Sequence, residues 1–205
     1  MEKCERKDVY KVYDKIADWF FENRYTGLLE KKYLDKLLSS VPANATILDL
    51  GCGTGKPIME YLLEKNLKVT GIDASSKMLE IARRNFPQET FIEQDMRLLD
   101  LNKKFDAIIA WDSFFHLPPA DQPQMFARFK KYLNLGGILI FTSGTQHGEA
   151  WGLNGGENLF HGSLDTTEYQ LLLNKHNFKT ISHTVEDPEC CGATVWVAKY
   201  TPADN

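Results

Sequence analysis

Three closely spaced glycines are the strongest chemical signal in the sequence. The segment ILDLGCGTGKP, residues 47–57, places Gly51, Gly53 and Gly55 between an expected strand and an expected helix. Without a Cβ atom, the backbone at such positions can turn sharply and approach a ligand closely. A dinucleotide fingerprint has the spacing G-x-G-x-x-G, which lets a pyrophosphate sit on the helix N-terminus. Here the spacing is G-x-G-x-G and Lys56 takes the last place, so the segment disfavours a pyrophosphate cradle.

Two acidic side chains follow, each at the end of a later expected strand. Asp73 closes the strand in VTGIDAS, about twenty residues after the glycine segment, where a carboxylate can accept both hydroxyls of a ribose. Asp95 follows the next strand in IEQDMRLL, where an acidic side chain can meet the amino group of an adenine. Met96 beside it can pack on the adenine ring. The spacing therefore predicts a ligand with an adenosine-type group.

The elements that must position these residues alternate between two periods. Short apolar runs are typical of buried strands, and longer segments with apolar residues at helical spacing separate them. The expected strands are residues 46–50, 68–72, 90–93, 105–111 and 138–142, and the expected helices between them are 57–65, 76–85 and 121–133. Two further strands, 179–186 and 193–199, are close enough to form an antiparallel hairpin. The pattern predicts an α/β fold with a three-layer, doubly wound, seven-stranded, mostly parallel sheet and an antiparallel last strand.

Two segments outside this alternation are expected to cover the site. Residues 9–24 and 28–38 have apolar residues at helical spacing, and we interpret residues 1–40 as an N-terminal helical lid. Residues 144–164 are rich in glycine and show no sustained period, which predicts an irregular loop before a helix that opens with the capping box DTTE. Long irregular segments in compact domains are often lids or binding loops, so we expect this one to cover the substrate. The alternative is a surface insertion without a role.

The order of the motifs resembles that of class I, Rossmann-like S-adenosylmethionine-dependent methyltransferases of the small-molecule type. LDLGCGTG, GIDAS, EQDM, FDAIIAWDSFFHLP and LNLGGILIFTSG carry the resemblance over residues 45–144, and YDKIADWFFENR resembles the lid that precedes the glycine motif. The resemblance implies S-adenosylmethionine as the cofactor and S-adenosylhomocysteine as its product. It also implies a cofactor site lined by Tyr13, Arg24, Asp49, Gly51, Gly53, Gly55, Asp73, Ala74, Asp95, Met96 and Trp111. Two of these have structural alternatives, because Tyr13 can belong to the core and Asp49 can fix the loop amides.

His116 is the residue that we expect to act as a catalytic base. Ligands of open α/β sheets bind outside the carboxyl ends of the strands, so residues 111–116 should face the transferable methyl group. Histidine has an ordinary pKa of about 6.5, which suits proton transfer, although a base is needed only if the acceptor must lose a proton. The alternative is that His116 caps a helix or packs behind the loop. In the covering loop, Trp151, Phe160 and His161 are expected to contact the substrate, with Glu149 as a further polar candidate.

Composition favours a small-molecule acceptor over a nucleic acid. Lys and Arg total 24 against 28 Asp and Glu, a formal net charge of −4, which gives no electrostatic footprint for a polynucleotide. The fourth strand is followed neither by an NPPY-like motif, as in enzymes that methylate amino groups of DNA or glutamine, nor by the Pro-Cys pair of cytosine C5 chemistry. We expect no metal, because the cysteines form no CxxC pair and are interpreted as free thiols: Cys4, Cys52, Cys190 and Cys191.

The chain is expected to act as one domain, residues 1–205, in the cytoplasm. Its N-terminus, MEKCERKDVYKVYDK, is charged, and no apolar run approaches about 18 residues, so we expect neither a secretory signal nor a membrane partner. The oligomeric state stays open. The predicted function is methyl transfer to an O, N or S atom of a small molecule by in-line displacement. The alternatives are a methyltransferase-like module that binds the cofactor without catalysis and a nicotinamide-dependent oxidoreductase, which the glycine spacing opposes.

Overall fold

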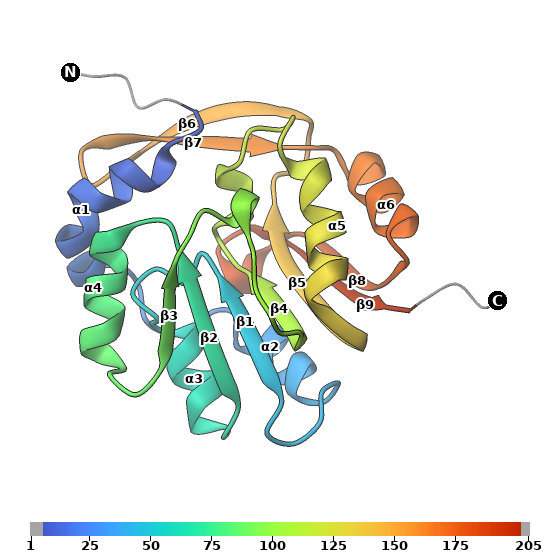
Figure 1. Ribbon diagram of the computed structural model, residues 1–205. Coiled ribbons are helices and arrows are strands. Elements are labelled where there is room, and N and C mark those ends of the chain that lie inside the picture. The colour runs from blue at the N-terminus through green and yellow to red at the C-terminus, as the bar shows by residue number, and fades with distance from the viewer. Residues whose placement is uncertain (1–5, 202–205) are drawn as a thin grey trace.

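A seven-stranded sheet forms the centre of the molecule (Figure 1). The computed structural model describes residues 6–201, so Cys4 lies outside the described residues. The strands follow the order β3-β2-β1-β4-β5-β9-β8. Their bounds are β1 Thr46–Leu50, β2 Lys68–Asp73, β3 Thr90–Glu93, β4 Phe105–Ala110, β5 Leu133–Ser143, β8 Phe178–Asp187 and β9 Ala193–Tyr200. Strands β1 to β5 pair in parallel and β9 is antiparallel to both of its neighbours, which confirms the predicted fold class.

Helices cover both faces of this sheet. They are α2 Lys31–Leu38, α3 Ile58–Glu64, α4 Ser76–Asn85, α5 Gln122–Tyr132 and α6 Thr166–Lys175. Neighbouring side chains of β1 point to opposite faces of the sheet. Ile47 belongs to a cluster with residues of α2 and α3, and Leu48 belongs to a cluster with residues of α5 and α6. Both faces of the central strands are therefore buried, which explains why these strands appear in the sequence as continuous apolar runs.

Two further elements lie over the end of the sheet at which the parallel strands finish (Figure 1). Helix α1 (Val9–Asn23) occupies one side, and strands β6 (Gly148–Asn154) and β7 (Glu157–Ser163) form a separate antiparallel hairpin. An apolar cluster joins the helix to the hairpin and consists of Val9, Val12, Ile16, Leu159 and Phe160. Helix α1 and the β6–β7 hairpin together form the cover of the site.

The prediction of an irregular loop over residues 144–164 is wrong. The segment contains the β6–β7 hairpin, and Gly155 and Gly156 form its two-residue turn with φ of 57° and 82°. Two consecutive residues with positive φ are typical of a type I′ turn, which Asn-Gly and Gly-Gly sequences favour. Asn154-Gly155-Gly156 was therefore a usable signal in the sequence. It was missed because β6 is mostly exposed and lacks the alternation of a half-buried strand.

Two predicted boundaries also need correction. Helix α2 begins at Lys31 and not at residue 28, because Leu28 has a φ of 50°, outside the helical region. Strand β5 begins at Leu133, directly after α5, and not at residue 138. The capping box before α6 is confirmed, since Asp165 and Glu168 each accept the other's backbone N–H at 2.8 Å. Among residues 6–201, no helix is both long and apolar enough to cross a lipid bilayer.

Candidate functional site

A pocket opens where β1, β2 and β4 end, beside helix α1. The predicted site residues that line it are Tyr13, Arg24, Gly51, Gly53, Asp73, Ala74, Asp95, Met96, Trp111 and His116. The predicted residues outside its lining are Asp49, Gly55, Trp151, Phe160 and His161. Sequence reasoning missed other lining residues, among them Lys7, Tyr10, Gln94 and Arg97. No local motif marks Lys7 or Tyr10, because only the docking of α1 brings them to the pocket.

The glycine segment forms the turn between β1 and α3. Gly51 donates its N–H to a carbonyl at the end of β2 at 2.7 Å, which holds the turn in place. A Cβ on Gly51 would lie 2.2 Å from the Cβ of Ser113, so glycine is required there. A Cβ on Gly53 would meet no atom within 4 Å, because this residue faces open space in the pocket. Gly55 serves packing instead, since a Cβ there would lie 2.8 Å from the Phe86 ring.

Asp73, at the end of β2, joins the glycine loop to the start of α4. Its Oδ2 accepts the N–H of Gly53 and its Oδ1 accepts the N–H of Ser75, both at 2.8 Å. Burial raises the pKa of this carboxyl above its ordinary value, and the backbone donors oppose that rise. Each carboxylate oxygen has a second lone pair. Asp73 therefore shapes the loop and can still accept hydrogen bonds from a ligand in the pocket.

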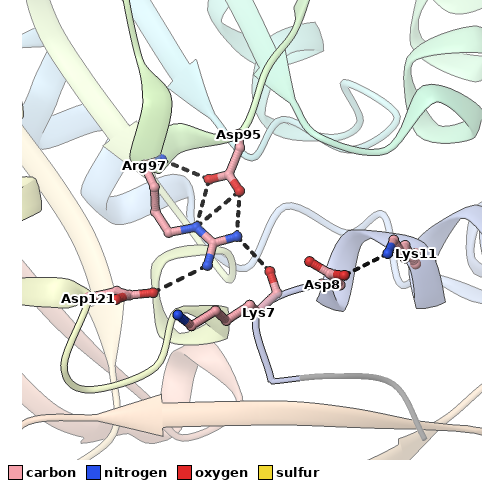
Figure 2. A network of polar contacts seen from close by, with 6 residues as sticks. All are labelled: Lys7, Asp8, Lys11, Asp95, Arg97 and Asp121. Atoms are coloured by element: carbon pink, nitrogen blue, oxygen red, sulfur yellow. Dashed lines mark hydrogen bonds and ion pairs between the residues drawn. The ribbon is translucent and has the colours of Figure 1, made fainter.

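Asp95 follows β3 and precedes the short helix η1 (Met96–Leu98). Its Oδ1 accepts the backbone N–H of Arg97 at 2.8 Å, as an N-terminal cap. The same carboxylate forms an ion pair with the Arg97 guanidinium, and Figure 2 shows the two side chains facing each other. Met96 is partly buried against the core beside them. The ion pair fixes the Asp95 carboxylate, a hydrogen-bond acceptor, at the edge of the pocket.

Arg24 supplies positive charge to a part of the pocket that also holds several acids. Its guanidinium lies 5.4 Å from the centre of the Phe20 ring, and its Nη2 is 3.5 Å from Oε1 of Glu30. Asp49 is buried in β1, where burial raises its pKa to about 7 and the charge of Arg24 opposes the rise. Arginine has five N–H donors, so one long contact leaves Arg24 able to bind a ligand carboxylate as well.

The end of β4 presents Trp111 and Asp112 to the pocket. Trp111 is buried with its ring centroid 5.6 Å from that of Tyr33. Asp112 is exposed and has a φ of 46°, a left-handed conformation that is unfavourable for residues other than glycine. Its backbone N–H donates to Oγ1 of Thr142 at 2.8 Å, which holds this conformation.

A hydrogen-bonded chain links α1, the short helix η2 (Phe114–His116) and β7. Nδ1 of His116 lies 2.8 Å from the Phe160 carbonyl oxygen, which can only accept, so Nδ1 carries the proton. Nε2 is then the acceptor for the hydroxyl of Tyr13 at 2.9 Å. Burial lowers the pKa of His116 to about 4 and raises the pKa of Tyr13. The pair is therefore neutral near pH 7, and it holds the Tyr13 oxygen at the pocket.

The expected substrate residues of the hairpin lie outside this pocket. Phe160 is fully buried in the cluster that joins α1 to β7. Trp151 is 48% exposed and packs its ring against the edge of Phe160, with centroids 5.3 Å apart. His161 has its ring centroid 4.9 Å from that of His116, and it lines a second groove with Phe115 and residues of 143–150. Glu149, in the same groove, pairs with Arg6 at 2.9 Å.

Residues 47–137 match the family model of the methyltransferase domain. Over this segment, which is less than half of its 205 residues, the chain is similar to methyltransferase domains. Its fold is similar to that of an amino pentose methyltransferase from Micromonospora echinaspora, solved with S-adenosylmethionine bound, at a TM-score of 0.72 and 19% identity over 93% of this chain and 97% of that chain. At this identity the likeness shows the fold alone.

Two relatives with named substrates illustrate the range of the family. The dTDP-3-amino-3,4,6-trideoxy-alpha-D-glucopyranose N,N-dimethyltransferase of Streptomyces venezuelae is 30% identical over 108 residues, 52% of this chain and 45% of that protein. A tRNA (carboxymethyluridine(34)-5-O)-methyltransferase of Xenopus tropicalis is 32% identical over 133 residues, 64% of this chain and 19% of that protein. The chain spans about half the length of most of these curated relatives, with values from 19% to 64%.

Proposed function

We propose that this protein transfers a methyl group from S-adenosylmethionine to a small-molecule acceptor. One observation carries the proposal: a single pocket brings together the glycine loop, two carboxylates and a guanidinium, from Asp73, Asp95 and Arg24. These groups come from four separate places in the chain, and the cofactor has a matching chemical group for each. A pyrophosphate ligand would need a different glycine spacing.

The residues of the pocket fit the parts of this cofactor. Beside the open space at Gly53, the oxygens of Asp73 would accept the ribose hydroxyls. Asp95 would accept the adenine amino group, and Arg24 would pair with the carboxylate of the methionine part. When bound, S-adenosylmethionine supplies a methyl group on a positively charged sulfur. Asp49 and Gly55 would support the loop from behind, without touching the ligand.

Tyr13 and His116 would serve the acceptor. A partly buried imidazole with a pKa of about 4 is a weak base. We therefore assign His116 mainly to holding the Tyr13 hydroxyl in place through Nε2. Where the acceptor must lose a proton, the proton would pass to the Tyr13 oxygen as the Tyr13 proton passes to Nε2 of His116. The carbonyl of Phe160 would keep the imidazole ring in the required tautomer.

The acceptor is proposed to be a small molecule that the cover encloses. Helix α1 and the hairpin lie over the site, as a lid would (Figure 1), and the net charge of −4 gives no general attraction to a polynucleotide. Relatives include an enzyme named for an amino sugar as well as one named for tRNA, so RNA is the outcome to exclude. Free thiols at Cys52, Cys190 and Cys191 favour a reducing compartment, and we propose the cytoplasm.

The test is a screen with S-adenosylmethionine carrying an isotopically labelled methyl group. The protein is incubated with fractionated small-metabolite extracts and, separately, with total tRNA, and labelled products are identified by mass spectrometry. We expect a labelled small molecule that is absent with the Asp73→Asn variant. Label in tRNA alone would contradict the small-molecule acceptor. Binding of S-adenosylhomocysteine without any labelled product would support a cofactor-binding module that lacks catalysis.

A further inference from the structure

Arg97 contacts three segments that are distant from one another in the sequence, at Lys7, Asp95 and Asp121 (Figure 2). Its Nε lies 3.0 Å from each carboxylate oxygen of Asp95, and its Nη2 lies 2.5 Å from Oδ2. Its Nη1 lies 3.2 Å from Oδ2 of Asp121, just before α5. Its Nη2 also donates to the backbone carbonyl of Lys7 at 2.6 Å, just before α1. One guanidinium thus joins the Asp95 end of the pocket, α5 and the N-terminal segment.

The network is sheltered and depends on the shape of arginine. The side chains of Arg97, Asp95 and Asp121 are 16%, 20% and 21% exposed. The contacts engage Nε–H, both hydrogens of Nη2 and at least one of Nη1, four of the five donors that a guanidinium offers. A lysine ammonium could replace the charge but could not reach these acceptors with one planar fork.

The segment that Arg97 anchors is a wall of the pocket. Lys7, Val9 and Tyr10 line the pocket together with Asp95 and Arg97. Arg6 adds an exposed ion pair to Glu149 of the hairpin, so the segment is attached on two sides. The Arg97 contact is the more sheltered of the two, and sheltered charge-assisted hydrogen bonds are the stronger ones. Of these two polar contacts, the one to Arg97 is therefore the main one that holds the wall, beside the apolar packing of Val9.

We propose that Arg97 is a positioning residue that couples adenine recognition by Asp95 to closure of the N-terminal segment over the pocket. This inference rests on the proposed function, because it takes an adenosine group as the ligand beside Asp95. Arg97 fixes the position of the Asp95 carboxylate, whose oxygens accept hydrogen bonds. Asp95 therefore selects a purine with a 6-amino donor over one with a 6-oxo acceptor. The same guanidinium accepts no bond but donates to the Lys7 carbonyl. The Asp95 carboxylate, by holding the guanidinium, therefore also holds the wall against the pocket.

The test compares the binding of S-adenosylhomocysteine and S-inosylhomocysteine to the wild type, Arg97→Met and Arg97→Lys. Methionine keeps a long side chain without charge or donors, and lysine keeps the charge without the fork. For Arg97→Met we expect S-adenosylhomocysteine to bind about tenfold more weakly or worse by calorimetry, and to dissociate several-fold faster in stopped-flow measurements. We expect most of the preference over S-inosylhomocysteine to be lost. Arg97→Lys should be intermediate in all three respects.

Hydrogen exchange of the backbone amides of residues 7–12 follows the wall directly. With S-adenosylhomocysteine bound, we expect these amides to exchange about tenfold faster in Arg97→Met than in the wild type, since a local opening becomes easier. The matched control is Arg84→Met, which makes the same change at an exposed arginine of α4 outside the network. The control should behave as the wild type in binding, preference and exchange.

The outcomes separate this inference from the proposed function. If Arg97→Met keeps the affinity, preference and exchange of the wild type, the inference is overturned and the function stands. If it loses affinity for both ligands equally together with a lower urea midpoint, Arg97 has a structural role only and the inference is again overturned. If Arg97→Met does not fold, Arg97→Lys decides by the same measurements. If the wild type does not bind S-adenosylhomocysteine, the proposed function itself fails.

Discussion

The floor of the pocket and its cover are held together in different ways. The floor consists of the ends of β1, β2 and β4, and β1 is hydrogen-bonded to both of the other two strands. The cover consists of α1 and a hairpin that forms a separate sheet. Besides two apolar clusters, which join α1 to the hairpin and to α4, the cover relies on single polar contacts, such as Tyr13 with His116 and Asp14 with Ser75 at 2.7 Å.

This difference has a physical consequence for function. Paired strands open only as a cooperative unit, whereas single contacts can break one at a time. The floor is therefore suited to hold a cofactor in a fixed geometry, and the cover is suited to admit and release ligands. Substitutions in the floor should change cofactor affinity, and substitutions in the cover should change stability, proton uptake or turnover.

The largest effect is expected for Phe160→Ala in the cover. Phe160 is fully buried where α1 meets the hairpin, so its loss should lower the free energy of unfolding by about 3–5 kcal/mol. Urea unfolding followed by circular dichroism measures the change. Trp151→Ala is the matched control, because Trp151 is 48% exposed and its loss should cost about 1 kcal/mol or less. Equal losses in the two variants would contradict the assignment of Phe160 as the anchor of the cover.

In the floor, Asp73→Asn should weaken binding of S-adenosylhomocysteine by about a hundredfold, on the order of 3 kcal/mol. The substitution keeps the shape but removes the charge that would accept the ribose hydroxyls. Asparagine can accept only one of the two backbone N–H groups that Asp73 accepts, from Gly53 and Ser75, so the free energy of unfolding should also fall by about 1–3 kcal/mol while the fold persists. Calorimetry gives the affinity, with Asp100→Asn at an exposed site as the control. An affinity within threefold of the wild type would leave Asp73 a role in loop shape only.

The pKa of His116 predicts a pH-dependent part of the stability. The unfolded chain binds the proton near pH 6.5 and the folded protein near pH 4, so between these values the unfolded state binds more protons. Stability from this group is complete above about pH 6.5 and is lost as the pH falls toward 4, on the order of 3 kcal/mol. The difference in unfolding free energy between wild type and His116→Asn should therefore shrink as the pH falls from about 6.5 to 4. A difference independent of pH would contradict a buried, neutral His116.

Comparing wild type with His116→Asn also controls for a second group that titrates in this range, Asp49. Asp49 has a pKa raised to about 7, so its contribution has the opposite sign, being present at low pH and lost as the pH rises toward 7. Both proteins contain Asp49, and its effect cancels in the difference.

The smallest effect is expected for Tyr13→Phe. This substitution keeps the ring and removes the hydroxyl that donates to Nε2 of His116. Turnover of the acceptor found in the labelling screen should fall about tenfold, while the affinity for S-adenosylhomocysteine changes little. The measurement is the rate of labelled methyl transfer at saturating cofactor. An unchanged rate would show that the tyrosine hydroxyl has no part in positioning the acceptor.

The floor could be predicted from the sequence because its rules are local. Asp73 and Asp95 each follow directly after an apolar strand, and the ends of parallel strands meet at one edge of the sheet. The glycine motif does not predict which of its residues line the pocket. Gly55 belongs to the same glycine pattern as Gly53, but it is needed for packing on Phe86 and does not line the pocket.

The contacts of the cover could not be predicted, because they depend on how separate elements dock. Tyr13 and His116 are 103 positions apart, and Arg97 and the Lys7 carbonyl are 90 apart. No spacing rule relates such residues, since the packing of α1 against α4 and β7 brings them together. The hairpin itself had a usable turn signal in Asn154-Gly155-Gly156, but its outer strand lacks the burial pattern that would have supported it.

The tip of the hairpin has a consequence for engineering. Hairpin turns are ordinarily good sites for inserted peptides and dyes. In this turn a Cβ on Gly156 would meet no atom within 4 Å, but Gly155 is closed to them, because a Cβ there would lie 2.8 Å from the ring of Trp19 and 3.0 Å from Ile16. An insertion there would push α1 away from β7. The turn at Gly192, where a Cβ would meet nothing within 4 Å, lies outside the cover, so an inserted reporter peptide should be placed there and not at Gly155.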